Sequence, residues 1–230
     1  MTVLHLADET EAADLAAFLS RLLHYDRGAA VRLQAAGTAL AVFGRPPSFE
    51  VLAVRAVRLA KPYENGLDVT LDVTVSAGEL LESVAKRAAT AAVPGAVTGP
   101  PWAGVLPPRG GWRAEPGLPA PDALRATVAA AVGEFRARTE GLAPERRTRA
   151  ELDRIGRDIW SREIGRTGLP VRAVHAAHSL GFLRPGTGAA DTGLLSSGAW
   201  LRLRTPYGSV AVRRVGASGS LGSLGVSVSG

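Results

Sequence analysis

The alternation of apolar and polar residues predicts an antiparallel sheet with two helices in the first part of the chain. Residues 66–77 alternate strictly, with five apolar side chains on one face, as in a half-buried strand. Apolar residues at helical spacing predict a helix over 8–25, which has acidic residues in its first turn, and a second helix over 77–92. Other strands are predicted at 2–7, at 29–44 as a hairpin turning near Gly37, and at 48–60.

The second half of the chain shows helical periodicity followed by strands. Helices are predicted over three segments, 121–139, 149–164 and 168–183. A glycine-rich loop over 184–198 then leads to two alternating runs within 199–214, joined by the turn sequence Thr-Pro-Tyr-Gly. The chain is therefore predicted to be an α+β protein. Its C-terminal helical domain ends in a β-hairpin, which is the element order of a winged helix.

Proline marks the boundary between the two halves. Residues 93–121 contain 8 of the 15 prolines and 6 of the 27 glycines, a composition typical of a linker or an ordered surface loop. The predicted domains are a sheet-and-helix domain over 1–92 and a helical domain with a basic hairpin over 122–215. Residues 216–230 are rich in glycine and serine and are predicted to form a flexible tail.

The N-terminal region resembles a half-repeat of the sliding-clamp family of processivity factors. The resemblance covers about 85 of the 230 residues and rests on apolar positions in the phrase VTVSAGELLESVAK: Val73, Val75, Ala77, Leu80, Leu81 and Val84. It implies a clamp-like sheet packed under helices, which in the family repeats to form a ring with basic helices facing DNA. The first helix here is acidic instead, with Asp8, Glu9, Glu11 and Asp14, and the sequence shows no second copy. No functional residue is therefore transferred from the family.

Charge divides the chain and suggests a polyanionic partner for its second half. Residues 1–100 carry 9 basic and 11 acidic side chains, whereas residues 101–230 carry 18 and 10. Such asymmetry is typical of nucleic-acid binding, although 25 of the 27 basic residues are arginine, as a GC-rich genome would also produce. Arginine can bind phosphate through two parallel hydrogen bonds. The candidate residues for contact with DNA or RNA are Arg146, Arg147, Arg149, Arg202, Arg204, Arg213 and Arg214.

Tryptophan in the proline-rich segment suggests a second class of function. Trp102 and Trp112 would be costly to expose, so they either attach the segment to a domain or present a recognition surface with Arg109. On the second interpretation the protein is a protein-interaction module or scaffold that binds another protein or a second copy of itself.

Two histidines at i,i+3 spacing form the most site-like motif in the chain. His175 and His178 share a helix face, but a metal needs at least a third ligand, and no HExxH pattern is present. Apolar residues surround most of the 168–183 helix, which leaves Arg172 and Ser179 as a narrow polar strip. We therefore expect both histidines to lie in the core, with at least one hydrogen-bonded there. A recognition helix would carry more hydrogen-bond donors for base edges.

The sequence contains none of the common motifs for catalysis or cofactor binding. The chain has no cysteine, and it shows no nucleophile elbow, P-loop or dinucleotide-binding fingerprint, so no cofactor or metal is predicted. The acidic N-terminal sequence and the lack of a long apolar run predict a cytoplasmic protein without a membrane partner. We expect a non-catalytic binding protein that contacts nucleic acid through its basic half. The alternative is the interaction module, and an enzyme of unknown reaction is third.

Overall fold

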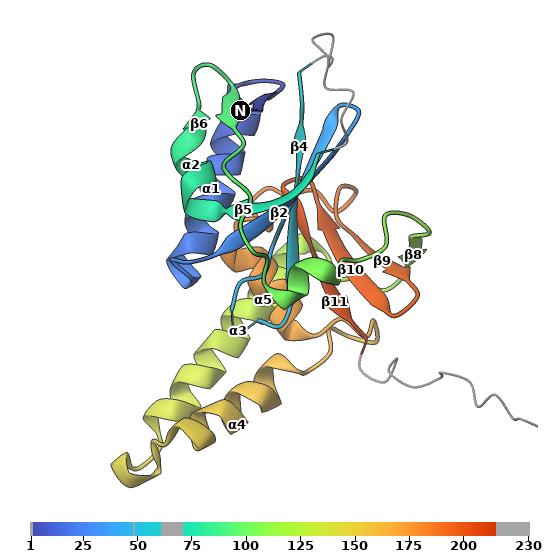
Figure 1. The fold of residues 1–230 in the computed structure, drawn as a ribbon. Coiled ribbons are helices and arrows are strands. Elements are labelled where there is room, and N and C mark those ends of the chain that lie inside the picture. The colour runs from blue at the N-terminus through green and yellow to red at the C-terminus, as the bar shows by residue number, and fades with distance from the viewer. Residues whose placement is uncertain (1, 48, 61–70, 215–230) are drawn as a thin grey trace, which may run out of the picture.

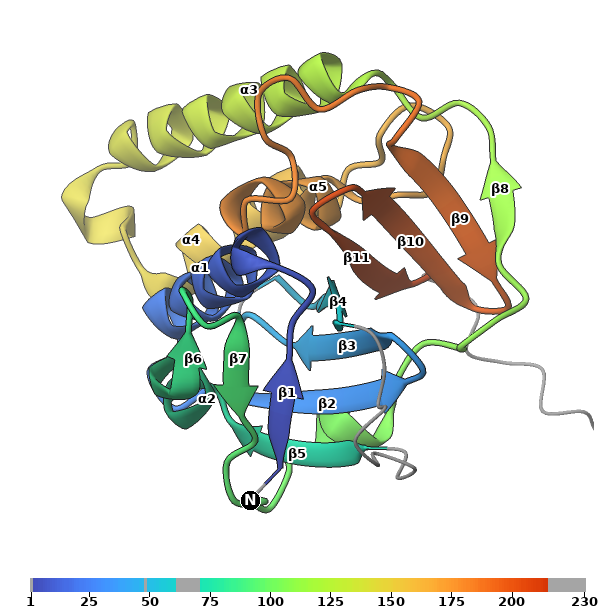
Figure 2. The ribbon, with the colours of Figure 1, turned by 90° about the horizontal axis from the view of Figure 1, so that it is seen from above.

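The computed structural model describes residues 2–47, 49–60 and 71–214 and has an α+β fold, as predicted. Its described part contains a sheet of eight strands and a small sheet of three (Figures 1 and 2). The larger sheet has the order β5 (Asp72–Ser76), β2 (Ala30–Ala36), β3 (Ala39–Gly44), β4 (Leu52–Arg58), β11 (Gly208–Arg213), β10 (Trp200–Thr205), β9 (Gly193–Ser197) and β8 (Arg113–Glu115). All of its neighbouring strands run antiparallel.

The two halves of the chain share this larger sheet. Strands β2 to β5 come from the N-terminal half and β8 to β11 from the rest, and β4 joins them by pairing with β11. In that ladder Leu52 lies opposite Ala211, and Val54 lies opposite Ser209. The predicted basic hairpin is therefore not a projecting wing. Its strands β10 and β11 lie inside the sheet, because the alternating apolar residues of both strands are buried in the core.

Helices cover one face of the larger sheet, which we call the inner face. They are α1 (Glu9–Tyr25) and α5 (Val171–Ser179), and their apolar side chains form one continuous core with the sheet. Helix α1 begins at Asp8, whose side chain accepts a hydrogen bond from the Glu11 backbone N–H at 2.8 Å, as an N-cap does. The aromatic ring of Phe18 on α1 stacks against Phe182, which follows α5.

Helix α3 (Pro121–Glu140) packs on α5 and forms a hairpin with α4 (Arg149–Trp160) whose far end extends away from the body (Figure 1). A 3₁₀ turn, η2 (Pro144–Arg146), lies at that far end.

Two predicted elements differ from the structure. The helix expected over 77–92 ends at Ser83 as α2 (Ala77–Ser83), and the chain then forms β6 (Val84–Ala85) and β7 (Thr90–Ala92). Strand β7 pairs with β1 (Val3–His5), and the Ser83 hydroxyl donates a hydrogen bond to the Ala92 carbonyl at 2.8 Å. The loop expected over 184–198 contains β9, which supplies the backbone partner for β10. In both segments, pairing with strands that are distant in the sequence overrides the secondary structure that the local sequence pattern favours.

The proline-rich segment runs across the opposite face of the sheet, which we call the outer face. Its residues Pro100–Trp112, named the strap, include the 3₁₀ turn η1 (Pro101–Gly104). Trp102 and Leu106 of the strap pack on a small cluster of Phe43, Leu52 and Val54. The Arg32 side chain on β2 donates to the carbonyl of Ala103, and the Ser197 hydroxyl on β9 donates to that of Gly110. The strap therefore contacts strands from both halves of the chain.

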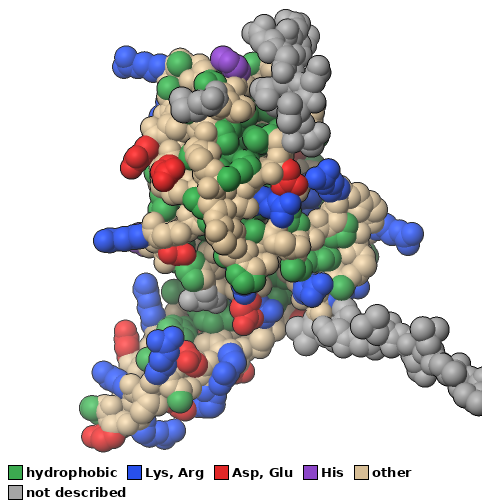
Figure 3. All heavy atoms as spheres, in the orientation of Figure 1, with side chains coloured by type: hydrophobic (Ala, Val, Ile, Leu, Met, Phe, Trp, Pro, Cys, Tyr) green, Lys and Arg blue, Asp and Glu red, His purple; other side chains and the backbone are tan. Residues whose placement is uncertain are grey.

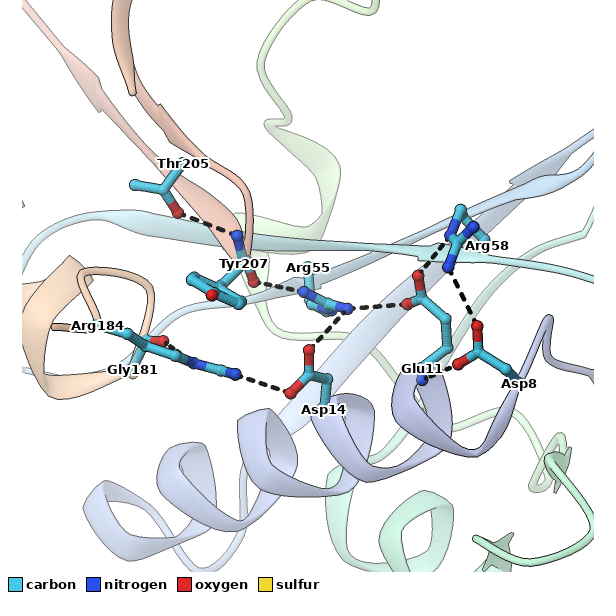
Figure 4. A network of polar contacts seen from close by, with 9 residues as sticks. All are labelled: Asp8, Glu11, Asp14, Arg55, Arg58, Gly181, Arg184, Thr205 and Tyr207. Atoms are coloured by element: carbon cyan, nitrogen blue, oxygen red, sulfur yellow. Dashed lines mark hydrogen bonds and ion pairs between the residues drawn. The ribbon is translucent and has the colours of Figure 1, made fainter. Parts of the chain in front are cut away.

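A buried charge network joins the two halves on the inner face (Figure 4). Arg55 of β4 is 5% exposed, and it donates to Glu11 of α1 and to the Tyr207 carbonyl in the β10–β11 turn, both at 2.8 Å. Asp14 of α1 lies 3.4 Å from the same guanidinium and accepts a hydrogen bond from Arg184 at 2.8 Å. Arg184 in turn covers the ring of Tyr207 at 3.9 Å. Every carboxylate of the network has a cationic partner, so the network is a structural joint.

We expect Arg55→Met to destabilise the protein strongly. The substitution keeps the apolar stem but removes the cation between Glu11 and Asp14, which are left with Arg58 and Arg184 as partners. Breaking a buried ion pair from one side costs about 3–5 kcal/mol, and the remaining partners place this case near about 3 kcal/mol. Urea unfolding at neutral pH measures the change. Arg149→Met, at the exposed start of α4, is the matched control and should leave the midpoint unchanged. A wild-type midpoint for Arg55→Met would contradict the role of the network.

Candidate ligand-binding face

The outer face carries arginines that have no acidic partner in the described ranges. Side chains alternate along β10 and β11, so Trp200, Arg202 and Arg204 face outward while Leu201 and Leu203 enter the core. Arg202 lies opposite Ala211 of β11, and Arg213 lies opposite Trp200. Within the described residues, four outer-face arginines form no ion pair with a carboxylate: Arg45, Arg202, Arg204 and Arg213.

Arg202 is the most unusual of these cations. It is half-buried, its Nε donates to the Ser209 hydroxyl at 2.8 Å, and its guanidinium lies 5.6 Å from the ring of Trp112. Burial lowers the pKa of Arg202, and the like charge of Arg204 lowers it further. By contrast, the hydrogen bond to Asp72 raises the pKa of Arg32 on the same face. A partly desolvated cation without a counter-ion is costly, so this position favours an anionic ligand.

A cleft next to these arginines is lined by two tryptophans. We call it the tryptophan cleft; it has a volume of about 330 Å³. Trp102 of the strap and Trp200 of β10 line it above a floor that includes Leu52 and Ala211. Arg213 stacks over the Trp200 ring at 5.4 Å. The cleft therefore combines flat aromatic surfaces with nearby positive charge.

A second, more polar cleft adjoins the first. It has a volume of about 440 Å³ and is lined by Ser76, Thr98 and loop glycines. Arg45 and Trp102 line both clefts, so they stand at the junction between a polar and an apolar compartment. Glu50 is on the rim of the tryptophan cleft, with a left-handed backbone φ of 52° that is uncommon for a residue other than glycine.

The structure separates the seven arginines predicted to contact nucleic acid. Arg202, Arg204 and Arg213 lie together on the outer face, whereas Arg214 pairs with Glu115 at 2.9 Å. The other three lie at the far end of the α3–α4 hairpin: Arg146, Arg147 and Arg149. The seven candidate arginines thus do not form one basic surface, because α3 and α4 carry this group away from the sheet.

The hairpin arginines are also largely occupied by other groups. Arg146 lies 3.7 Å from Glu151, and Arg149 lies 3.8 Å from Asp153. Arg147 donates to the carbonyls of Glu140 and Leu142. Figure 3 shows basic and acidic side chains intermixed over this projection. Its charges therefore neutralise one another to a large extent.

The strap residues predicted for protein interaction also lie against the sheet. Trp102 and Trp112 are half-buried, and the Trp112 indole N–H donates to the Pro108 carbonyl at 3.0 Å. Arg109 is exposed and lies 4.0 Å from Asp72. The two indoles thus attach the strap to the outer face, and Trp102 also lines a cleft there.

The histidine pair does not lie together in the core as expected. His178 is exposed, and only His175 is partly enclosed, stacked on Trp160 at 4.7 Å and edge-on to Phe49 at 5.1 Å. No hydrogen bond to the His175 ring is formed by the residues that the structure describes. Among all the residues that the structure describes, no three histidine or acidic side chains are grouped so that they could hold a metal ion. The aromatic neighbours make His175 a packing residue between α4 and α5.

We expect His175 to make stability depend on pH. Burial lowers its pKa from the ordinary value of 6.5, and the charge of His178 lowers it further. The unfolded chain therefore takes up the proton first, and stability falls as the pH drops below about 6.5. His175→Phe keeps the aromatic packing and should lose less melting temperature than wild type between pH 7.5 and pH 5. His5→Gln, at an exposed position, is the control and should keep the wild-type difference. Equal losses in all three proteins would contradict the assignment.

Two family models match the chain. Residues 1–104 match a domain of unknown function, DUF8010, and residues 107–217 match a domain of unknown function, DUF8185. The two matched regions meet within the proline-rich segment, at the strap. No curated protein and no solved structure matches the chain. The likeness to sliding clamps therefore remains a resemblance in apolar pattern and element order. None of the helices in the described ranges has the length and hydropathy needed to cross a membrane.

Arg45, Glu50 and Trp200 line the tryptophan cleft but are not among the site residues predicted from the sequence. Arg45 and Glu50 belong to the connection between β3 and β4, which carries no motif. A signal for Trp200 was present, because period-two alternation places it on the same side as Arg202 and Arg204. Recognising the cleft also requires knowing that the strap crosses this face.

Proposed function

We propose that the protein is a non-catalytic binding protein that holds single-stranded nucleic acid on the outer face of its larger sheet. The observation that carries the proposal is a group of arginines among tryptophans that form no ion pair within the described residues, above all the half-buried Arg202 beside Trp112. Single-stranded nucleic acid offers phosphates for such cations and flat bases for such indoles.

The arrangement favours a single strand over a duplex. A duplex is usually read by an element that enters the major groove, and α5 is poorly suited to this because it is packed between α3 and the sheet. The α3–α4 hairpin projects, but its charges are mostly paired with one another. A sheet face with aromatic side chains instead suits unstacked bases, which lie flat on indole rings while phosphates follow nearby arginines.

Nucleic acid remains the proposed partner, but only some of the arginines predicted from the sequence remain as contact residues. Arg202, Arg204 and Arg213 remain from the group chosen on sequence, and Arg45, Trp102, Trp112 and Trp200 join them. Arg146, Arg147, Arg149 and Arg214 are removed, because they lie elsewhere and most have acidic partners.

We expect the triple variant Arg202→Gln, Arg204→Gln, Arg213→Gln to lose affinity for a fluorescently labelled, mixed-sequence 20-nucleotide strand. Fluorescence anisotropy at several salt concentrations measures both affinity and its salt dependence. Losing three phosphate contacts should weaken binding at least tenfold at low salt, and it should flatten the slope of log K against log salt by about 2. DNA and RNA versions of the strand are compared in parallel.

The matched control is the triple variant Arg146→Gln, Arg147→Gln, Arg149→Gln. It removes the same formal charge from the hairpin end and should keep wild-type affinity. Thermal melts check that both variants are folded. Equal weakening by the two triples would show a nonspecific charge effect, and no binding by wild type at low salt would end the proposal in favour of a protein partner.

A further inference from the structure

We propose that the tryptophan cleft is a pocket for a single nucleobase and that it selects bases with hydrogen-bond donors on their edge, guanine first. This inference rests on the proposed function, because it assigns one base of the bound strand to a particular cleft.

The size and lining of the cleft suit a flat aromatic group. Its volume of about 330 Å³ lies at the small end of ligand sites, which span about 300–1,000 Å³. Trp102 and Trp200 supply the aromatic surfaces, and the floor residues Leu52 and Ala211 are apolar. Stacking of a base on an indole is worth about 1–3 kcal/mol and is available to every base, with only modest preferences among them. The indoles therefore explain binding but not selectivity.

The charges around the cleft suit a phosphate attached to that base. Arg45 lines both the tryptophan cleft and its polar neighbour, and Arg213 lines the tryptophan cleft beside Trp200. Neither forms an ion pair with a carboxylate in the described ranges. The polar cleft adds Ser76 and Thr98, and its one carboxylate, Asp26, accepts a hydrogen bond from the Gly28 backbone N–H at 2.9 Å. A nucleotide can thus place its base in the tryptophan cleft and its phosphate on Arg45.

Glu50 is the feature that points to selectivity. Among the residues lining the tryptophan cleft it is the one carboxylate, and its side chain is 72% exposed. Arg172 of α5 lies 3.6 Å from its carboxylate without forming a hydrogen bond to it, so both carboxylate oxygens are free to accept hydrogen bonds from a ligand. The left-handed backbone of Glu50 costs energy, and strain of this kind is concentrated at binding sites.

An ionised carboxylate accepts hydrogen bonds and donates none. A base edge beside Glu50 must therefore supply N–H groups. Guanine offers two adjacent donors, N1–H and the N2 amino group, which match the two carboxylate oxygens. Cytosine and adenine each offer one amino group, and uracil offers a single N–H between two carbonyl oxygens that the carboxylate repels. The expected order of affinity is guanine, then cytosine and adenine, then uracil.

Titrations with the four ribonucleoside monophosphates test this order, with quenching of tryptophan fluorescence as the readout. Wild type should bind GMP about tenfold more tightly than UMP, as expected for a good bidentate contact. Glu50→Gln should lower the GMP to UMP ratio severalfold, because the amide replaces one of the two acceptor oxygens with a donor. Trp200→Leu should weaken all four nucleotides together. Glu115→Gln, whose carboxylate faces Arg214, is the matched control and should keep the wild-type ratio.

The possible results separate this inference from the proposed function. Equal affinities for all four nucleotides in wild type would overturn the selectivity assigned to Glu50. Binding of the 20-nucleotide strand without binding of any mononucleotide would overturn the cleft as a base pocket while leaving the outer face as the nucleic-acid site. A wild-type ratio in Glu50→Gln would show that selectivity arises elsewhere. Loss of both kinds of binding would end both proposals.

Discussion

The buried guanidinium of Arg55 holds the two halves of the chain in one fold. It contacts two carboxylates of α1 and a carbonyl 152 residues away in the β10–β11 turn. An unpartnered charge at this depth would be costly, so α1, β4 and that turn can be placed only together. The β4–β11 ladder lies beside this joint and makes the larger sheet continuous. The strap and the outer face both depend on that continuity.

The two faces of the larger sheet differ in how their charged side chains are paired. On the inner face each carboxylate near Arg55 has a cationic partner, and the network joins α1 to β4 and to the β10–β11 turn (Figure 4). On the outer face Arg202 is half-buried and has no carboxylate partner in the part of the chain that the structure describes, and it lies beside a strap that brings Trp102 and Trp112 onto strands of both halves. This contrast is why we propose ligand binding for the outer face and a structural role for the inner network.

Local patterns in the sequence were sufficient for the fold class and for part of the site. Period-two alternation places Arg202 and Arg204 on one side of β10, and helical periodicity locates α1, α3, α4 and α5. The pairing of β4 with β11 left no local signal, because its strands are about 150 residues apart in the chain. Without that pairing, Arg45 and Trp200 could not be assigned to the same cleft. The hairpin arginines looked equivalent to the sheet arginines because salt bridges such as Arg146 to Glu151 depend on tertiary structure.

The central claim is that nucleic acid lies on the outer face of the sheet, along the strap. Ultraviolet crosslinking of a single-stranded oligonucleotide to the protein, followed by mass spectrometry of the peptides, tests it most directly. The account predicts crosslinks in peptides that contain Trp102, Trp112 or Trp200, and their loss when unlabelled strand competes. Crosslinks confined to the hairpin end around Arg146 to Arg149 would contradict it.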